Sequence, residues 1–122
     1  MEANSCMSVR EKIQKGLGNL CYITTELNNK TLLDALEHTT CYQTNSVVDL
    51  PMNRIHTYVS TQQGVTKKAI ESRLNRCKKD FILYLPVDAL NNVFGTDEVN
   101  QLLHMTEHDF IMAVSTYVVN NW

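Results

Sequence analysis

The spacing of apolar residues near the start of the chain predicts an amphipathic helix. Val9, Ile13 and Leu17 recur at helical intervals. The segment Ser8–Glu11 has the form of a capping box, in which a serine oxygen accepts an amide proton and a glutamate reaches back to the serine amide. We therefore expect a first helix over residues 8–16.

The pattern is less regular over the next thirty or so residues. Residues 19–27 fit either a helical face or a strand, and Asn28-Asn29 indicates a break. Thr31 can then cap a short, leucine-rich helix. Residues 39–49 are polar and β-branched without periodicity, so we expect a loop or an irregular strand there.

Two helices separated by a glycine are predicted in the middle of the chain. Pro51 suits the first turn of a helix, and an apolar stripe continues from there to about Ser60. Gly64 breaks the pattern, and Thr66 can cap a second helix that extends to about Cys77.

The last third of the chain predicts one short strand and three helices. Five consecutive apolar residues, Phe81–Leu85, are the best strand candidate, although a buried helical segment has the same pattern. Helices are expected over residues 87–94, from residue 96 through Leu103, and from Thr106 onward.

These elements define a mainly α fold: a compact bundle of six or seven helices in a single domain, residues 1–122, with at most a short strand near 80–85. A length of 122 residues suits one domain, and 43% hydrophobic with 20% charged residues is ordinary globular composition. The expected core residues are Ile13, Leu17, Leu33, Leu36, Ile55, Val59, Ile70, Leu74, Leu83, Leu90, Phe94, Leu102, Phe110, Val114 and Val118.

Composition also bounds where the protein works. No apolar run approaches the ~20 residues that a membrane span needs, and the first residues lack the pattern of a secretory signal. Four cysteines without such a signal favour reduced thiols. We expect an intracellular protein, nuclear if it is eukaryotic or viral in a eukaryotic host, with no membrane partner.

The net charge of −2 conceals a strong asymmetry along the sequence. Residues 54–79 carry seven Lys and Arg against one Glu, a net +6, whereas residues 80–122 carry six acidic residues and no Lys or Arg, a net −6. The basic segment can attract a polyanion or dock onto the acidic half of the same chain.

Residues 55–76 resemble a helix-turn-helix, with the pattern closest to the lactose-repressor family. The resemblance implies that Val59 and Ile70 hold two helices at a steep angle, that Gly64 supplies a positive φ in the turn, and that the second helix enters the DNA major groove. Gln63 and Arg73 are polar where this pattern usually has small or apolar residues.

The resemblance also assigns roles to the cationic and polar residues of the segment. The side chains expected to face bases are Lys67, Lys68, Ser72 and Asn75, and those expected to face phosphates are Arg54, Arg73, Arg76, Lys78 and Lys79. A homodimer is expected, because one such unit rarely buries enough surface for tight specific binding. We therefore predict a small DNA-binding protein that regulates transcription.

Residues from about 60 to 122 are more distantly similar to a BEN domain, a helical module that binds DNA or proteins. The residues that carry this similarity are 87–94, 96–99 and 110–114. A competing hypothesis is a helical interaction module, an adaptor or a viral modulator of a host factor, that meets a protein partner through the acidic C-terminal half.

Candidate catalytic and metal motifs are weak. His104-Met105-Thr106-Glu107-His108 matches an inverted zinc-protease pattern, but Thr106 as a helix cap would place the two histidines on different elements. His38 and Cys41 could form half of a zinc site, completed by Cys21, His56 or Cys77, and buried free thiols are the alternative. We expect no enzyme activity, no catalytic residues, no metal and no cofactor.

Overall fold

The computed structural model describes residues 8–20, 26–45 and 50–121, and this part of the chain forms seven α-helices and no strand. The helices are α1 (Val9–Gly18), α2 (Glu26–Asn45), α3 (Met52–Gln63), α4 (Lys67–Tyr84), α5 (Val87–Phe94), α6 (Val99–Leu103) and α7 (Glu107–Asn120). The mainly α fold class predicted from the sequence is confirmed.

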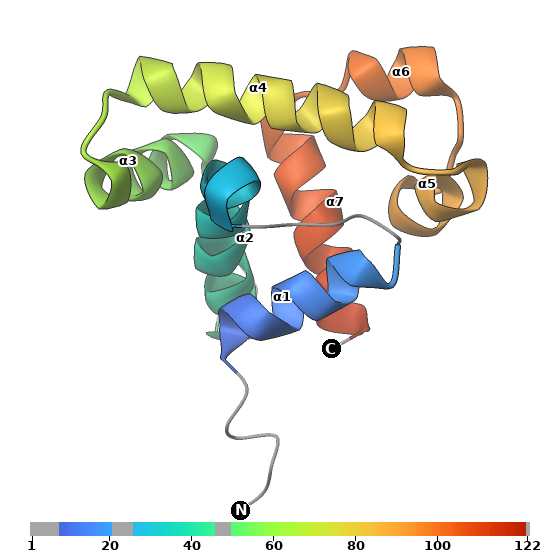
Figure 1. Cartoon of the computed structure of the whole chain (residues 1–122), viewed down its shortest axis with the longest axis horizontal. Coiled ribbons are helices and arrows are strands. Elements are labelled where there is room, and N and C mark those ends of the chain that lie inside the picture. The colour runs from blue at the N-terminus through green and yellow to red at the C-terminus, as the bar shows by residue number, and fades with distance from the viewer. Residues whose placement is uncertain (1–7, 21–25, 46–49, 122) are drawn as a thin grey trace, which may run out of the picture.

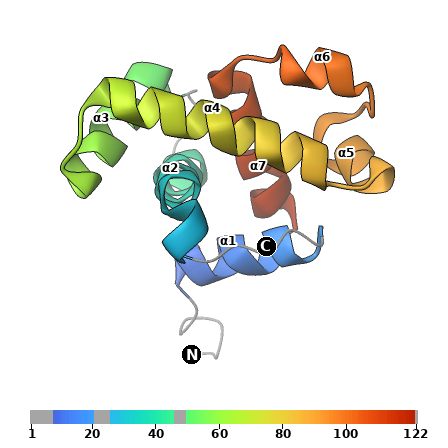
Figure 2. The ribbon, with the colours of Figure 1, turned by 45° about the horizontal axis from the view of Figure 1, so that its top comes forward.

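The helices are arranged in crossed layers (Figure 1). Helices α2 and α7 pack against each other in the middle. Helix α4 crosses one end of this pair and α1 crosses the other end, as both views show (Figures 1 and 2). Helix α3 lies at the N-terminal end of α4, and α5 and α6 lie at its C-terminal end.

One apolar core joins the layers. Three phenylalanines link α4, α5 and α7: the Phe81 ring meets Phe110 edge-on at a centroid distance of 5.4 Å and Phe94 at 6.3 Å. Of the fifteen core residues expected from the sequence, Phe94 is only half-buried and Leu83 is 57% exposed, so the placement of Leu83 in the core is wrong. The others are buried, together with Leu20, Leu32, Ala35, Leu50, Phe81, Ile82, Leu85, Ala89 and Ile111.

Helix α1 begins as the sequence predicts. The Ser8 hydroxyl accepts from the Glu11 amide at 3.1 Å, and the Glu11 carboxylate accepts from the Ser8 amide at 2.8 Å. The helix continues to Gly18, slightly beyond the predicted end. Within it, a Cβ on Gly16 would lie 3.4 Å from Val118 Cγ2, so a glycine there allows α1 to pack closely on α7.

The loop predicted over residues 39–49 is wrong for residues 39–45, which continue α2. The hydroxyls of Thr39 and Thr40 donate to the carbonyls of Ala35 and Leu36 one turn earlier, each at 2.8 Å, so these residues are buried inside a helix without unpaired polar groups. The break expected at Asn28-Asn29 is a kink within α2, where Asn29 has φ −128°. The ambiguous residues 21–25 lie outside the described residues.

The strand expected near 80–85 is also wrong, because this run forms the last turns of α4. Phe81, Ile82 and Leu85 are buried while Leu83 and Tyr84 are exposed, which is a helical and not an alternating arrangement. Because all five residues are apolar, the sequence could not distinguish a helical pattern of burial from an alternating one.

The remaining predicted boundaries agree closely with the structure. The Thr106 hydroxyl accepts from the Asp109 amide at 3.1 Å and caps α7, and Gly95 ends α5 with φ 77°. Helix α6 begins at Val99, after the predicted start. Within the described residues, no helix combines the length and the apolar character needed to cross a membrane.

Candidate nucleic-acid interface

Helices α3 and α4 are joined by a tight turn built on one glycine. Gly64 ends α3 with φ 66°, and its amide and that of Val65 both donate to the Ser60 carbonyl. The Thr66 hydroxyl accepts from the Ala69 amide at 3.1 Å and starts α4. A left-handed residue followed by a capping residue turns the chain within three positions, as the sequence predicts.

The outer face of α4 carries a stripe of cations and small polar groups. Lys68, Ser72, Asn75, Arg76 and Lys79 recur at intervals of three or four residues and are all exposed. They lie opposite the buried face of the same helix, so they point away from the core. We call this set the basic stripe. Helix α4 runs across its end of the molecule with α6 beside its C-terminal half (Figure 1), and the side chains of the stripe remain exposed.

Other predicted contact residues are held by neighbouring groups. Lys67 Nζ donates to Asn53 Oδ1 at 3.3 Å, and Lys78 is half-buried with its Nζ donating to the Met105 carbonyl at 2.6 Å. Lys78 therefore ties α4 to the loop before α7 and does not extend the basic stripe. Arg54 is exposed on α3, outside the stripe.

The two polar residues that depart from the helix-turn-helix pattern contact each other. Gln63 Oε1 accepts from Arg73 at 2.8 Å and from the Thr31 hydroxyl at 3.2 Å, while Gln63 Nε2 donates to Asp34 at 3.0 Å. Asp34 is buried and also accepts from the guanidinium of Arg10 on α1. A polar chain thus runs from α1 through α2 to the end of α3 and the flank of α4.

The cations of the basic segment can meet either the acidic half of the same chain or an external anion. Among the described residues, no Lys or Arg of residues 54–79 lies within salt-bridge distance of a carboxylate of residues 80–121. The one contact of this kind involves a histidine: His56 Nε2 on α3 lies 3.0 Å from Glu107 Oε1 on α7. The exposed cations of the basic stripe, Lys68, Arg76 and Lys79, are therefore not paired with carboxylates of the acidic half.

Glu107 is the most perturbed carboxyl of the described structure. Burial raises its pKa, and the hydrogen bond and charge of His56 oppose this increase. Its Oε2 atom is buried with no hydrogen-bond partner among the described residues. The pair of Glu107 and His56 is a contact between α3 and α7.

The described residues do not assemble either of the metal sites considered from the sequence. Among the described residues, no three His, Cys, Asp or Glu side chains lie close enough to hold an ion. His104 lies at the end of α6, and His108 lies on α7 with its Nε2 2.9 Å from the Leu50 carbonyl, so the two histidines are on different elements. The His38 ring stacks on Tyr58 at a centroid distance of 4.1 Å.

The described thiols are half-buried. Burial raises the pKa of Cys77 to about 11 and also raises the pKa of Cys41, so neither thiol is poised as a nucleophile. Cys6 and Cys21 lie outside the described residues.

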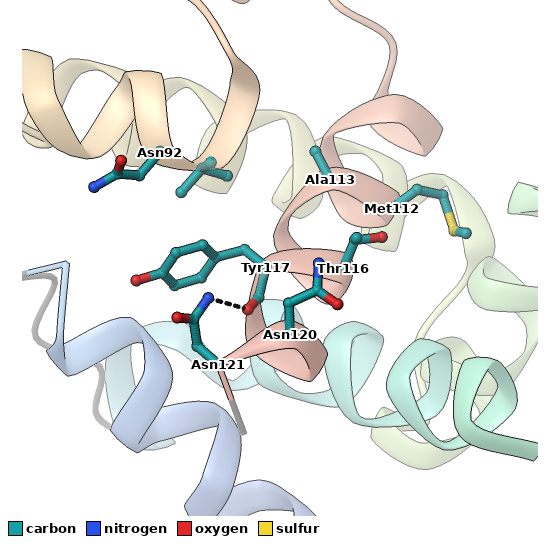
Figure 3. A pocket seen from close by; sticks show the side chains of 8 residues that line it. Asn92, Met112, Ala113, Thr116, Tyr117, Asn120 and Asn121 are labelled. Atoms are coloured by element: carbon teal, nitrogen blue, oxygen red, sulfur yellow. Dashed lines mark hydrogen bonds between the residues drawn. The ribbon is translucent and has the colours of Figure 1, made fainter.

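A separate hollow lies between α5 and α7 (Figure 3). Its lining is neutral, with the amides of Asn92, Asn120 and Asn121 around the Tyr117 ring, and Asn121 Nδ2 donates to the Tyr117 carbonyl at 2.9 Å. No titratable pair or cation enters this hollow among its lining residues, so it offers no acid–base chemistry and no charge for a nucleic acid.

Comparison with known protein families, with curated sequences and with solved structures finds no match to this chain. The resemblances to the lactose-repressor unit and to the BEN domain therefore depend on the quoted residues alone.

Sequence reasoning missed two features near the basic stripe. Lys30 on α2 lies beside Arg73 and Arg76 although it is more than forty residues away in sequence, and no periodic signal could connect them. Leu83, Tyr84 and Val87 form an exposed apolar patch at the junction of α4 and α5, with exposed fractions of 57%, 56% and 57%. The sequence did not indicate that Leu83 and Tyr84 are exposed, because all five residues of Phe81–Leu85 are apolar.

Proposed function

We propose that this protein binds duplex DNA through the basic stripe of α4 and acts as an intracellular regulator of transcription. The observation that carries the proposal is the stripe itself: three exposed cations interleaved with Ser72 and Asn75 on a helix that follows a glycine turn. An exposed helix of this kind fits the major groove, which admits one α-helix.

The side chains of the stripe divide by chemistry. Asn75 can bond adenine through two atoms, and Lys68 and Ser72 can reach base edges nearer the start of the helix. Arg76 and Lys79 then neutralise phosphates, with Arg54 reaching the backbone from α3. Lys67 can exchange its bond to Asn53 for a DNA contact, and Arg73 can reach a phosphate with the donors that its bond to Gln63 leaves.

We propose that the DNA-binding form is a homodimer. Helix α4 has 18 residues and is therefore ~27 Å long. On DNA, a single helix of this length buries less protein surface than tight, specific complexes usually bury. The apolar patch of Leu83, Tyr84 and Val87 lies at the C-terminal end of the stripe. Two copies related by a two-fold axis can pair these apolar side chains with each other, which leaves Lys79, one turn before the patch, to the DNA.

The proposal is tested by anisotropy titration of a random-sequence duplex with two charge-matched variants. Lys68→Gln with Lys79→Gln removes two cations from the stripe, and Lys12→Gln with Lys15→Gln removes two from α1, at the far side of the molecule (Figure 1). We expect the stripe variant to bind at least about tenfold more weakly at ~50 mM salt, because each lost phosphate contact costs affinity, and the α1 variant to bind like the unaltered protein. Equal affinities would end the proposal.

Sequence preference is tested at one residue. Asn75→Ala should change the ranking of sequences in a selection experiment, because a base contact worth roughly 1–3 kcal/mol is lost. Lys79→Gln should weaken binding to all sequences alike and serves as the matched control.

A second function is favoured by the exposed patch and its surroundings. Leu83 and Val87 adjoin Asp88, and further exposed carboxylates of the C-terminal half are Asp97, Glu98 and Asp109. An apolar centre with a charged rim is typical of a protein interface. If the unaltered chain shows no DNA binding at ~50 mM salt, an interaction module with a basic protein partner becomes the better assignment.

A further inference from the structure

A hollow of about 340 Å³ lies between the kinked start of α2 and the flank of α4, beside the basic stripe. Lys30 and Thr31 line it from α2, Gln63 lies at its edge, and Arg73, Arg76 and Asp80 line it from α4. The N-terminal end of α2 lies beneath α4 (Figure 1), and Arg76 belongs both to the lining of the hollow and to the basic stripe.

Three cations from two helices meet in this hollow. Lys30, Arg73 and Arg76 stand against a single lining carboxylate, Asp80, which is exposed. Lys30 Nζ lies 3.9 Å from Asp34, but Asp34 is buried and already accepts from Arg10 and Gln63. Arg10 is also paired with Glu37 at 2.6 Å, and Arg10 and Lys30 share Asp34. The lining residues themselves, three cations against Asp80, carry a net positive charge.

Arg73 is positioned before any ligand arrives. Its guanidinium donates to Gln63, whose amide is fixed by Thr31 and by the buried Asp34. A guanidinium has five N–H donors, so this one bond leaves others for an anion. Holding Arg73 in place in the free protein lowers the conformational entropy that binding would otherwise cost.

We propose that this hollow binds a phosphate group. Two guanidinium groups one turn apart with an ammonium opposite them match an oxyanion of charge near −2 better than a carboxylate, because guanidinium groups can bond two phosphate oxygens at once. The phosphate can belong to the DNA strand on α4, in which case the site rests on the proposed function, or to a free phosphate monoester, in which case it does not.

The first arm of the test uses inorganic phosphate. Chemical-shift titration at constant ionic strength should show saturable shifts at the amides around Lys30 and Arg76. Lys30→Gln and Arg76→Gln should each weaken phosphate binding about tenfold, since a hydrogen bond to a charged group is worth roughly 1.5–3 kcal/mol. Lys15→Gln removes the same charge from an exposed position on α1, outside both the hollow and the basic stripe, and should leave phosphate binding unchanged. Absence of saturable shifts, or equal loss in Lys15→Gln, would overturn the proposal.

The second arm uses the random duplex and separates the two sources of phosphate. If Lys30→Gln also weakens duplex binding and lowers its salt slope by about one, the bound phosphate belongs to DNA. If Lys30→Gln weakens only inorganic phosphate binding, the site takes a free phosphate monoester. If the unaltered chain binds inorganic phosphate through Lys30 but binds no DNA, the proposed DNA-binding function is wrong and the proposed phosphate site stands.

Discussion

The two polar residues that depart from the helix-turn-helix pattern, Gln63 and Arg73, depart together because they bond to each other. Each is polar where a helix-turn-helix usually has a small or apolar residue, and they are hydrogen-bonded at 2.8 Å. Gln63 also bonds Asp34 and Thr31, so the departure replaces apolar packing with a polar chain between α2 and the α3–α4 turn. Because a glutamine amide with three partners is well satisfied, the exchange carries little desolvation cost.

A pH dependence belongs to a second residue, Glu107. Burial raises its pKa above the usual value of 4.5. In the window from there to the higher pKa of the folded state, the native chain holds a proton that the unfolded chain releases, so the free energy of unfolding falls as pH rises. Glu107→Gln cannot titrate, and its stability relative to the unaltered chain should therefore increase as the pH rises from the ordinary carboxyl range through the raised pKa of Glu107.

Urea unfolding at several pH values measures this difference. Glu98→Gln, which alters an exposed carboxylate, is the control for a general charge effect. A stability difference between Glu107→Gln and the unaltered chain that stays constant with pH would contradict the assignment.

At the scale of elements, capping residues in the sequence predicted where helices begin, but the sequence did not predict features that depend on packing between helices. Capping residues such as Ser8, Thr66 and Thr106 act within a few positions, so their helices start as predicted. The run Phe81–Leu85 has no polar residue to mark its exposed side, and its helical form depends on the core beneath α4. Lys30 joins the hollow only because α2 folds under α4, which no local pattern contains.

The turn between α3 and α4 gives a prediction about backbone conformation. Gly64→Ala should reduce the free energy of unfolding by about 1 kcal/mol, because a Cβ in the left-handed region is strained. A Cβ at Gly64 meets no atom within 4 Å, so the loss is conformational and not a steric clash.

Gly18→Ala is the matched control. This glycine ends α1 without a positive φ, and a Cβ there also meets nothing within 4 Å. Alanine should be neutral or stabilise by up to about 1 kcal/mol. Thermal unfolding that ranks the two variants the other way would contradict the account of the turn.

For the whole molecule, the crossed layers explain how one helix can be presented as a surface. Helices α2 and α7 support α4 from below while α3, α5 and α6 pack at its ends, so α4 buries one face and exposes the opposite one along its length. The basic stripe, the hollow lined by Lys30, Arg73 and Arg76, and the apolar patch all include residues of α4.

The apolar patch predicts a concentration-dependent dimer. Leu83→Ser should raise the dimer dissociation constant about tenfold or more, since each copy loses the burial of a large apolar side chain. Leu83→Met keeps the apolar contact and should dimerise like the unaltered chain. Sedimentation equilibrium measures both, and a chain that stays monomeric at all concentrations would remove the dimer from the proposal.

The salt dependence of duplex binding tests the central claim most directly. The logarithm of the association constant should fall linearly with the logarithm of salt concentration, with a slope of several units. In the variant with Lys68→Gln and Lys79→Gln this slope should be smaller by about two, while Lys12→Gln with Lys15→Gln should keep the original slope. An unchanged slope in the stripe variant, or an equal reduction in both variants, would contradict the assignment of DNA binding to the outer face of α4.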